Sequence, residues 1–139
     1  MSQGCGGTII GTRYVLTAAH CTDGELPSML YVTVGDTIMG TTFEAQSFII
    51  GVDKIIQHER YPDYYGNEFA FDIALLKLSE ELDLSKYPHI KPACLPAQSA
   101  TFPGKTTSIH GFFSMVKHFF LNLNFLYRVQ GSNIWIWEH

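Results

Sequence analysis

The sequence predicts an all-β fold in which short antiparallel strands form a barrel or a sandwich. Short runs rich in β-branched and aromatic residues recur along the chain, for example at residues 13–17 and 30–34. Turn-forming pairs, Asp23-Gly24 and Gly35-Asp36, separate such runs. The 139 residues contain no heptad, solenoid or low-complexity repeat. A chain of this length with several short strands is expected to form about one domain.

The expected elements follow in chain order. A short segment bounded by glycines opens the chain at residues 6–12. A strand is expected at 13–17 and a single helical turn at 18–22. The remaining expected elements are a strand at 30–34, one or two strands at 48–56, a polar loop at 61–67 and an apolar strand at 73–78.

Composition excludes several classes of protein. The chain is 46% hydrophobic and 16% charged, with a net charge of −4, which is ordinary for a soluble globular chain. No apolar run approaches the roughly 20 residues of a membrane span, and residues 1–5 show no secretory signal. Five Lys and Arg residues are scattered over residues 84–139 without forming a stripe, so we expect no nucleic-acid binding.

The three cysteines, Cys5, Cys21 and Cys94, leave at least one thiol without a partner inside the chain. Zinc is one interpretation, because His20 stands beside Cys21, but no C-x₂₋₄-C pair exists and adjacent residues rarely bind one ion together. A disulfide between Cys5 and Cys21 is the other interpretation. It would close a loop of about 15 residues and contribute roughly 3 kcal/mol. Such a bond is typical of an oxidising, extracellular compartment.

Three segments carry a family resemblance. They are Cys5-Gly6-Gly7-Thr8-Ile9-Ile10 with Tyr14-Val15-Leu16-Thr17-Ala18-Ala19-His20-Cys21, then Phe71-Asp72-Ile73-Ala74-Leu75-Leu76-Lys77-Leu78, then Lys91-Pro92-Ala93-Cys94-Leu95-Pro96. In this order and at these spacings they resemble the chymotrypsin/trypsin-like serine proteases over about residues 4–111. The resemblance implies the first of two β-barrels, with the active site in the cleft between them. It also implies a disulfide between Cys5 and Cys21, and an unpaired Cys94 that tethers a pro-segment or a second chain.

The resemblance implies catalytic roles for two residues. A serine hydroxyl is a poor nucleophile at neutral pH and needs an adjacent base, which His20 would be. Asp72 would hold the imidazole in the right tautomer and stabilise its cation. Phe71 is a departure, since the family often has Asn there. No cofactor and no metal are expected. Asp36 and Glu44 fall where some relatives bind calcium, but the region offers too few oxygen ligands.

The catalytic serine of the family is missing from the sequence. No Gly-Asp-Ser-Gly-Gly segment occurs, and the one serine that follows a glycine, Ser132, does not match it. The Ile-Val-Gly-Gly-type terminus and the barrel's first strand, which the family places before Cys5, are also absent. We therefore expect an incomplete barrel with an exposed strand edge, and a chain that folds poorly alone.

The resemblance ends at Gly111, where the family usually has a Gly-Trp-Gly-like turn. Residues 1–111 are expected to be a partial protease domain and residues 112–139 an unrelated aromatic-rich tail. Within that tail, residues 119–126 would form a short strand or an apolar helix. The abrupt change favours a splice or reading-frame artefact, and the alternative is a genuine tail that covers an exposed barrel edge.

Two functional hypotheses follow. In the first, the chain is the N-terminal half of a secreted serine endopeptidase that acts on proteins or peptides, inactive as written because the serine is absent. In the second, it is a non-catalytic protease homologue that binds a protein partner through the barrel surface. The genomic sequence after the Gly111 codon distinguishes the two hypotheses.

Overall fold

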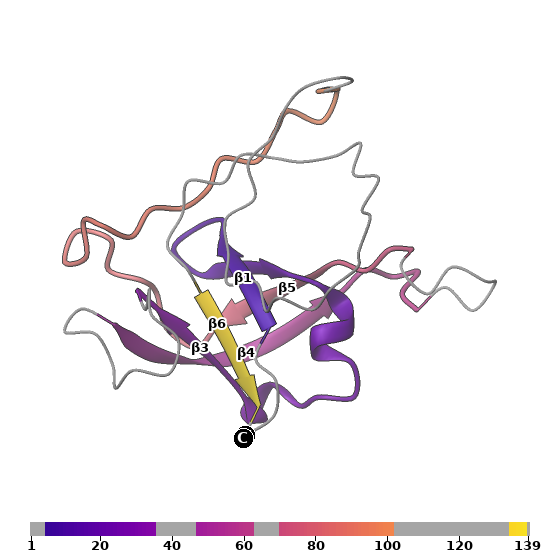
Figure 1. Cartoon of the computed structure of the whole chain (residues 1–139), viewed down its shortest axis with the longest axis horizontal. Coiled ribbons are helices and arrows are strands. Elements are labelled where there is room, and N and C mark those ends of the chain that lie inside the picture. The colour runs from indigo at the N-terminus through magenta and orange to yellow at the C-terminus, as the bar shows by residue number, and fades with distance from the viewer. Residues whose placement is uncertain (1–4, 36–46, 63–69, 102–133, 139) are drawn as a thin grey trace, which may run out of the picture.

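The computed structural model describes residues 5–35, 47–62, 70–101 and 134–138, which form a closed antiparallel barrel (Figure 1). The strands are β1 (Cys5–Ile9), β2 (Tyr14–Thr17), β3 (Leu30–Val34), β4 (Phe48–Gln57), β5 (Ala74–Leu78) and β6 (Ile134–Glu138). Two 3-10 turns, η1 (Ala19–Thr22) and η2 (Pro27–Met29), lie between β2 and β3. Around the barrel the order is β1-β2-β5-β4-β3-β6. The predicted all-β antiparallel fold is confirmed.

Most of the predicted elements agree with the structure within a residue or two. Residues 30–34 form β3 as expected, and residues 48–57 form a single strand where one or two strands were expected. That strand has a register irregularity between Val52 and Lys54, where it bends along β5. The expected helical turn is η1. The predicted elements at 119–126 and most of the loop at 61–67 lie outside the described residues, as do Asp36 and Glu44.

The barrel interior is built largely by alternation along the strands, although β3 buries Thr33 as well as Val32 and Val34. In β5 the residues Ala74, Leu76 and Leu78 are buried while their neighbours are partly exposed. This period of two is what a strand with one face toward a core requires. The buried apolar cluster comprises Ile9, Val15, Leu30, Val32, Val34, Ile50, Val52, Leu76, Leu78, Leu82 and Ile90. The described strands β1 to β5 therefore surround one continuous core.

One expectation is wrong. An open barrel edge was predicted because the family's first strand is missing, but β6 pairs with β1 on one side and with β3 on the other. The yellow arrow in Figure 1 lies along both strands. Residues 134–138 come from the expected aromatic-rich tail, and their pairing agrees with the alternative in which that tail covers a barrel edge. The division of the chain at Gly111 stays a prediction. Among the residues that the structure describes, no helix is long and apolar enough to cross a membrane.

Candidate functional site

The barrel brings His20 and Asp72 to the same place, although they are far apart in the sequence. Strands β2 and β5 are antiparallel neighbours, and Thr17 at the end of β2 pairs with Ala74 at the start of β5. The turn η1 follows β2 directly and carries His20. Asp72 lies two residues before β5 begins. The end of one strand and the start of its neighbour therefore place both side chains at one end of the barrel.

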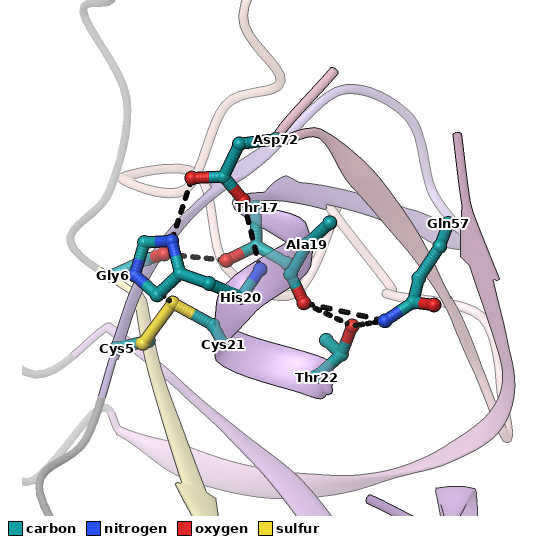
Figure 2. The surroundings of a disulfide bond; sticks show 9 residues. All are labelled: Cys5, Gly6, Thr17, Ala19, His20, Cys21, Thr22, Gln57 and Asp72. Carbon is teal, nitrogen blue, oxygen red and sulfur yellow. Dashed lines mark hydrogen bonds and ion pairs between the residues drawn. A yellow bond between two sulfur atoms is a disulfide. The ribbon is translucent and has the colours of Figure 1, made fainter. Parts of the chain in front are cut away.

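Asp72 accepts two hydrogen bonds from His20. The backbone N–H of His20 donates to Oδ1 of Asp72 at 2.8 Å, and Nδ1 of the imidazole lies 2.6 Å from Oδ2 (Figure 2). An ionised carboxylate only accepts hydrogen bonds, so this contact requires the proton of a neutral imidazole to be on Nδ1. The lone pair is then on Nε2, the nitrogen that faces away from Asp72.

The carboxylate and the imidazole have different environments. The side chain of Asp72 is 15% exposed and that of His20 is 60% exposed. Burial by itself raises the pKa of Asp72. Four interactions outweigh burial and hold the pKa of Asp72 below its ordinary value. They are the hydrogen bonds from the backbone N–H and the ring of His20, the charge on that ring, and a hydrogen bond from the backbone N–H of Ala19. Asp72 is therefore a carboxylate at neutral pH, and the imidazole beside it is accessible from solvent.

The disulfide between Cys5 and Cys21 joins β1 to η1. The predicted pairing is confirmed. Figure 2 shows the imidazole of His20 between Asp72 and this bond, with Nε2 3.4 Å from the sulfur of Cys21. Because that sulfur is in a disulfide, it carries no proton to donate. The hydroxyl of Thr17 adds a second tie to β1, donating to the carbonyl of Gly6 at 2.9 Å.

A polar network beneath the turn fixes its backbone. The hydroxyl of Thr22 donates to the carbonyl of Ala19 at 2.9 Å. The amide of Gln57, at the end of β4, donates to the hydroxyl of Thr22 at 3.0 Å and lies 3.3 Å from the carbonyl of Ala19. Ala19 and Thr22 are both buried, so these bonds satisfy groups that solvent does not reach. Sequence reasoning did not single out Gln57, because nothing local links it to a turn far earlier in the chain.

The residue before the carboxylate has an unusual backbone conformation. Phe71 has φ of 60°, in the left-handed region that costs free energy for a residue with a bulky side chain. Asn tolerates this region better, which gives a physical reason for the Asn that the family often has there. The ring of Phe71 stacks on His58 at 4.9 Å and lies 4.0 Å from the guanidinium of Arg60. These contacts favour the conformation despite its backbone cost.

One cluster has donor atoms close enough for a metal ion in the described part of the chain. It consists of Cys5, His20 and Cys21. Two of these residues share a disulfide, so their sulfurs are not available as thiolate ligands. The geometry gives no support for a metal in the oxidised chain. Cys94 is a free, exposed cysteine in the described part of the chain.

Comparison with known protein families identifies this fold and site. The family model described as Trypsin matches residues 1–113. This chain belongs to the trypsin family. The predicted resemblance is confirmed, and the barrel is the first of the two barrels of the trypsin fold.

Several trypsin-family members are similar to the chain over most of its length. Chymotrypsin-C of Bos taurus is 39% identical over 99 residues, covering 71% of the chain and 34% of the relative. Serine protease filzig of Drosophila melanogaster is 36% identical over 108 residues, which cover 77% of the chain and 6% of filzig. Venom serine protease 34 of Apis mellifera is 34% identical over 137 residues, which cover 91% of the chain and 33% of that protease. The solved structure of GrC is 35% identical with a TM-score of 0.56, and the match covers 70% of the chain and 39% of GrC. The chain thus spans about a third or less of these curated relatives.

Proposed function

We propose that the chain carries the histidine and aspartate of a serine endopeptidase, with His20 as general base and Asp72 as the group that orients it. The observation that carries this proposal is the contact of 2.6 Å between Nδ1 of His20 and Oδ2 of Asp72. The carboxylate fixes the tautomer, so that Nε2 of a solvent-accessible imidazole is free to take a proton.

The proposed reaction is hydrolysis of a peptide bond in a protein substrate. Nε2 of His20 takes the proton of a serine hydroxyl as its oxygen attacks the carbonyl carbon, and returns that proton to the leaving amine. The negative charge of Asp72 stabilises the imidazolium that forms between those two steps. The family's serine segment does not occur in this sequence, so the proposal places the nucleophile in a longer product of the same gene.

The disulfide and the relatives support an extracellular location. A bond between Cys5 and Cys21 persists in oxidising compartments, and two similar proteins are venom serine proteases. Exposed Cys94 is a suitable site for a disulfide to a pro-segment or to a second chain. In this proposal residues 1–111 form the partial protease domain.

A specific observation also favours a non-catalytic homologue that binds a protein. β6 closes the barrel within this chain, so the barrel has no exposed edge between β1 and β3. A closed barrel that lacks the family's serine segment is suited to act as a binding module.

The transcript beyond the Gly111 codon, followed by an assay of its product, tests these alternatives. An endopeptidase transcript continues into a Gly-Asp-Ser-Gly-Gly segment, and its product hydrolyses peptide esters. Asp72→Asn should then lower kcat about 10⁴-fold, because the imidazole takes the wrong tautomer. Asp53→Asn, which breaks an exposed pair with Lys77, is the matched control and should leave kcat unchanged. A confirmed transcript that ends as written, with no labelling of its product by a serine-directed phosphonate, would favour the binding module.

A further inference from the structure

The residue immediately before Asp72 has a backbone conformation that is costly for its type. Among the residues that the structure describes, Phe71 is the one residue other than glycine with a positive φ, at 60°. Bulky side chains rarely adopt this left-handed region. Such conformations persist only where surrounding contacts hold them, and they cluster at functional sites. The contacts that hold Phe71 therefore bear on the carboxylate that follows it.

The backbone around Asp72 forms a tight turn that is tied to the end of β4. The N–H of Ile73 donates to the carbonyl of Phe71 at 2.7 Å, which places Asp72 at the centre of a three-residue turn. The N–H of His58, directly after β4, donates to the carbonyl of Ile73 at 3.0 Å. A change of φ at Phe71 turns this unit, with its carboxylate, relative to the chain that precedes it. The two contacts of Asp72 with His20, at 2.8 and 2.6 Å, therefore depend on that angle.

The ring of Phe71 contacts two side chains that follow β4. His58 stacks on it with the ring centroids 4.9 Å apart and the planes 24° apart. The guanidinium of Arg60 lies 4.0 Å from the centroid of the Phe71 ring. The backbone N–H of Arg60 donates to Nδ1 of His58 at 3.1 Å, so the two partners belong to one turn. Stacking and cation–π contacts are both favourable, and together they offset the cost of the left-handed backbone.

We propose that Phe71 is a positioning residue for Asp72, held in its left-handed conformation by the contacts of its ring with His58 and Arg60. The inference rests on the proposed function, because it concerns the geometry of the pair formed by His20 and Asp72. An asparagine tolerates this backbone region without help from a ring. With phenylalanine here, the direction of the carboxylate depends on two side chains outside the catalytic pair.

The test measures the tautomer of the His20 ring in the 139-residue chain by ¹⁵N NMR, at a pH where the imidazole is neutral. A ring nitrogen that carries a proton and one that carries a lone pair have well separated ¹⁵N shifts. The wild type should have the proton on Nδ1, which faces Asp72. Phe71→Ala loses the ring contacts and keeps the backbone cost, so the ratio of the Nδ1–H to the Nε2–H form should fall about tenfold.

Two other substitutions at the same position separate positioning from packing. Phe71→Gly and Phe71→Asn also lose the ring, but both residues tolerate a positive φ. We expect them to keep the wild-type ratio of tautomers. A packing role alone would give all three variants the same ratio, and that result would overturn the proposal.

Arg60→Ala tests the ring contact at an exposed position, where it should not prevent folding. It should lower the ratio about threefold in the wild-type chain and leave it unchanged in Phe71→Gly, since the contact is already absent there. Lys86→Ala is the matched control, because it removes a cation–π contact with Tyr87. It should leave the ratio unchanged. If Phe71→Ala does not fold, Arg60→Ala decides: an unchanged ratio, or an equal loss in Phe71→Gly, would overturn the proposal.

Asp72→Asn in the same measurement separates this inference from the proposed function. It should shift the proton of the His20 ring away from Nδ1, because the carboxylate no longer accepts it. An unchanged ratio in Asp72→Asn would contradict the proposed function and this inference together. A shift in Asp72→Asn without one in Phe71→Ala would overturn this inference alone.

Discussion

Replacing Asp72 by alanine removes the acceptor of two hydrogen bonds from His20, at 2.8 and 2.6 Å. A hydrogen bond to a charged group contributes about 1.5–3 kcal/mol when it is protected from water. The backbone hydrogen bond to the half-buried carboxylate should contribute an amount within that range. The bond to the exposed imidazole should contribute less, because solvent screens it. We expect a total loss of about 2 kcal/mol in the free energy of unfolding.

Urea unfolding followed by tryptophan fluorescence measures this loss. With an m-value of about 2 kcal/mol/M, Asp72→Ala should lower the midpoint by roughly 1 M. The matched control is Asp53→Ala, which breaks a pair of similar length, 2.8 Å, between Lys77 and a carboxylate that is 50% exposed. Its midpoint should equal that of the wild type, because an exposed pair is screened. Equal midpoints for the two variants would refute the reasoning.

The effect should also depend on pH, with a sign fixed by the lowered pKa of Asp72. A carboxylate whose pKa is lower in the folded than in the unfolded chain stabilises the fold above the unfolded value of about 3.9. This contribution disappears as the pH falls through the lower folded value. The difference between wild type and Asp72→Ala should therefore be constant above about pH 5 and shrink below about pH 4. A difference that grows on acidification would contradict this assignment.

The remaining predictions concern the core, the cysteines and the reaction. Leu76→Ala, at a position with 0% exposure, should cost about 2–5 kcal/mol in urea unfolding. Loss of the disulfide by Cys5→Ala with Cys21→Ala should cost roughly 3 kcal/mol. Non-reducing peptide mapping should show that bond and one maleimide-reactive thiol, on Cys94; a link from Cys94 to either partner would contradict the assignment. The 139-residue chain should not hydrolyse peptide esters in a way that His20→Ala abolishes, because the serine segment is absent.

The local elements were predictable because each is encoded by neighbouring residues. The alternation of apolar residues in 74–78 defines β5 and its buried face without any tertiary information. The motifs around Cys5, His20 and Asp72 predicted the disulfide and proposed the catalytic pair through their resemblance to trypsin-like proteases. Their spacing in the sequence says nothing about distance, however. The pairing of Thr17 with Ala74 explains why the two side chains meet.

Two features depended on tertiary structure alone. Gln57 supports the turn beneath His20 only because β4 passes beside η1, and a glutamine at the end of a strand has no local pattern that identifies such a role. Residues 134–138 could be judged an unrelated tail from the sequence, because their composition changes abruptly from that of the preceding domain. A strand's propensity is local, but its partners are chosen by whichever edges lack hydrogen bonds in the folded barrel. The sequence therefore determined that this segment favours an extended strand, and only the barrel decided that its place is between β1 and β3.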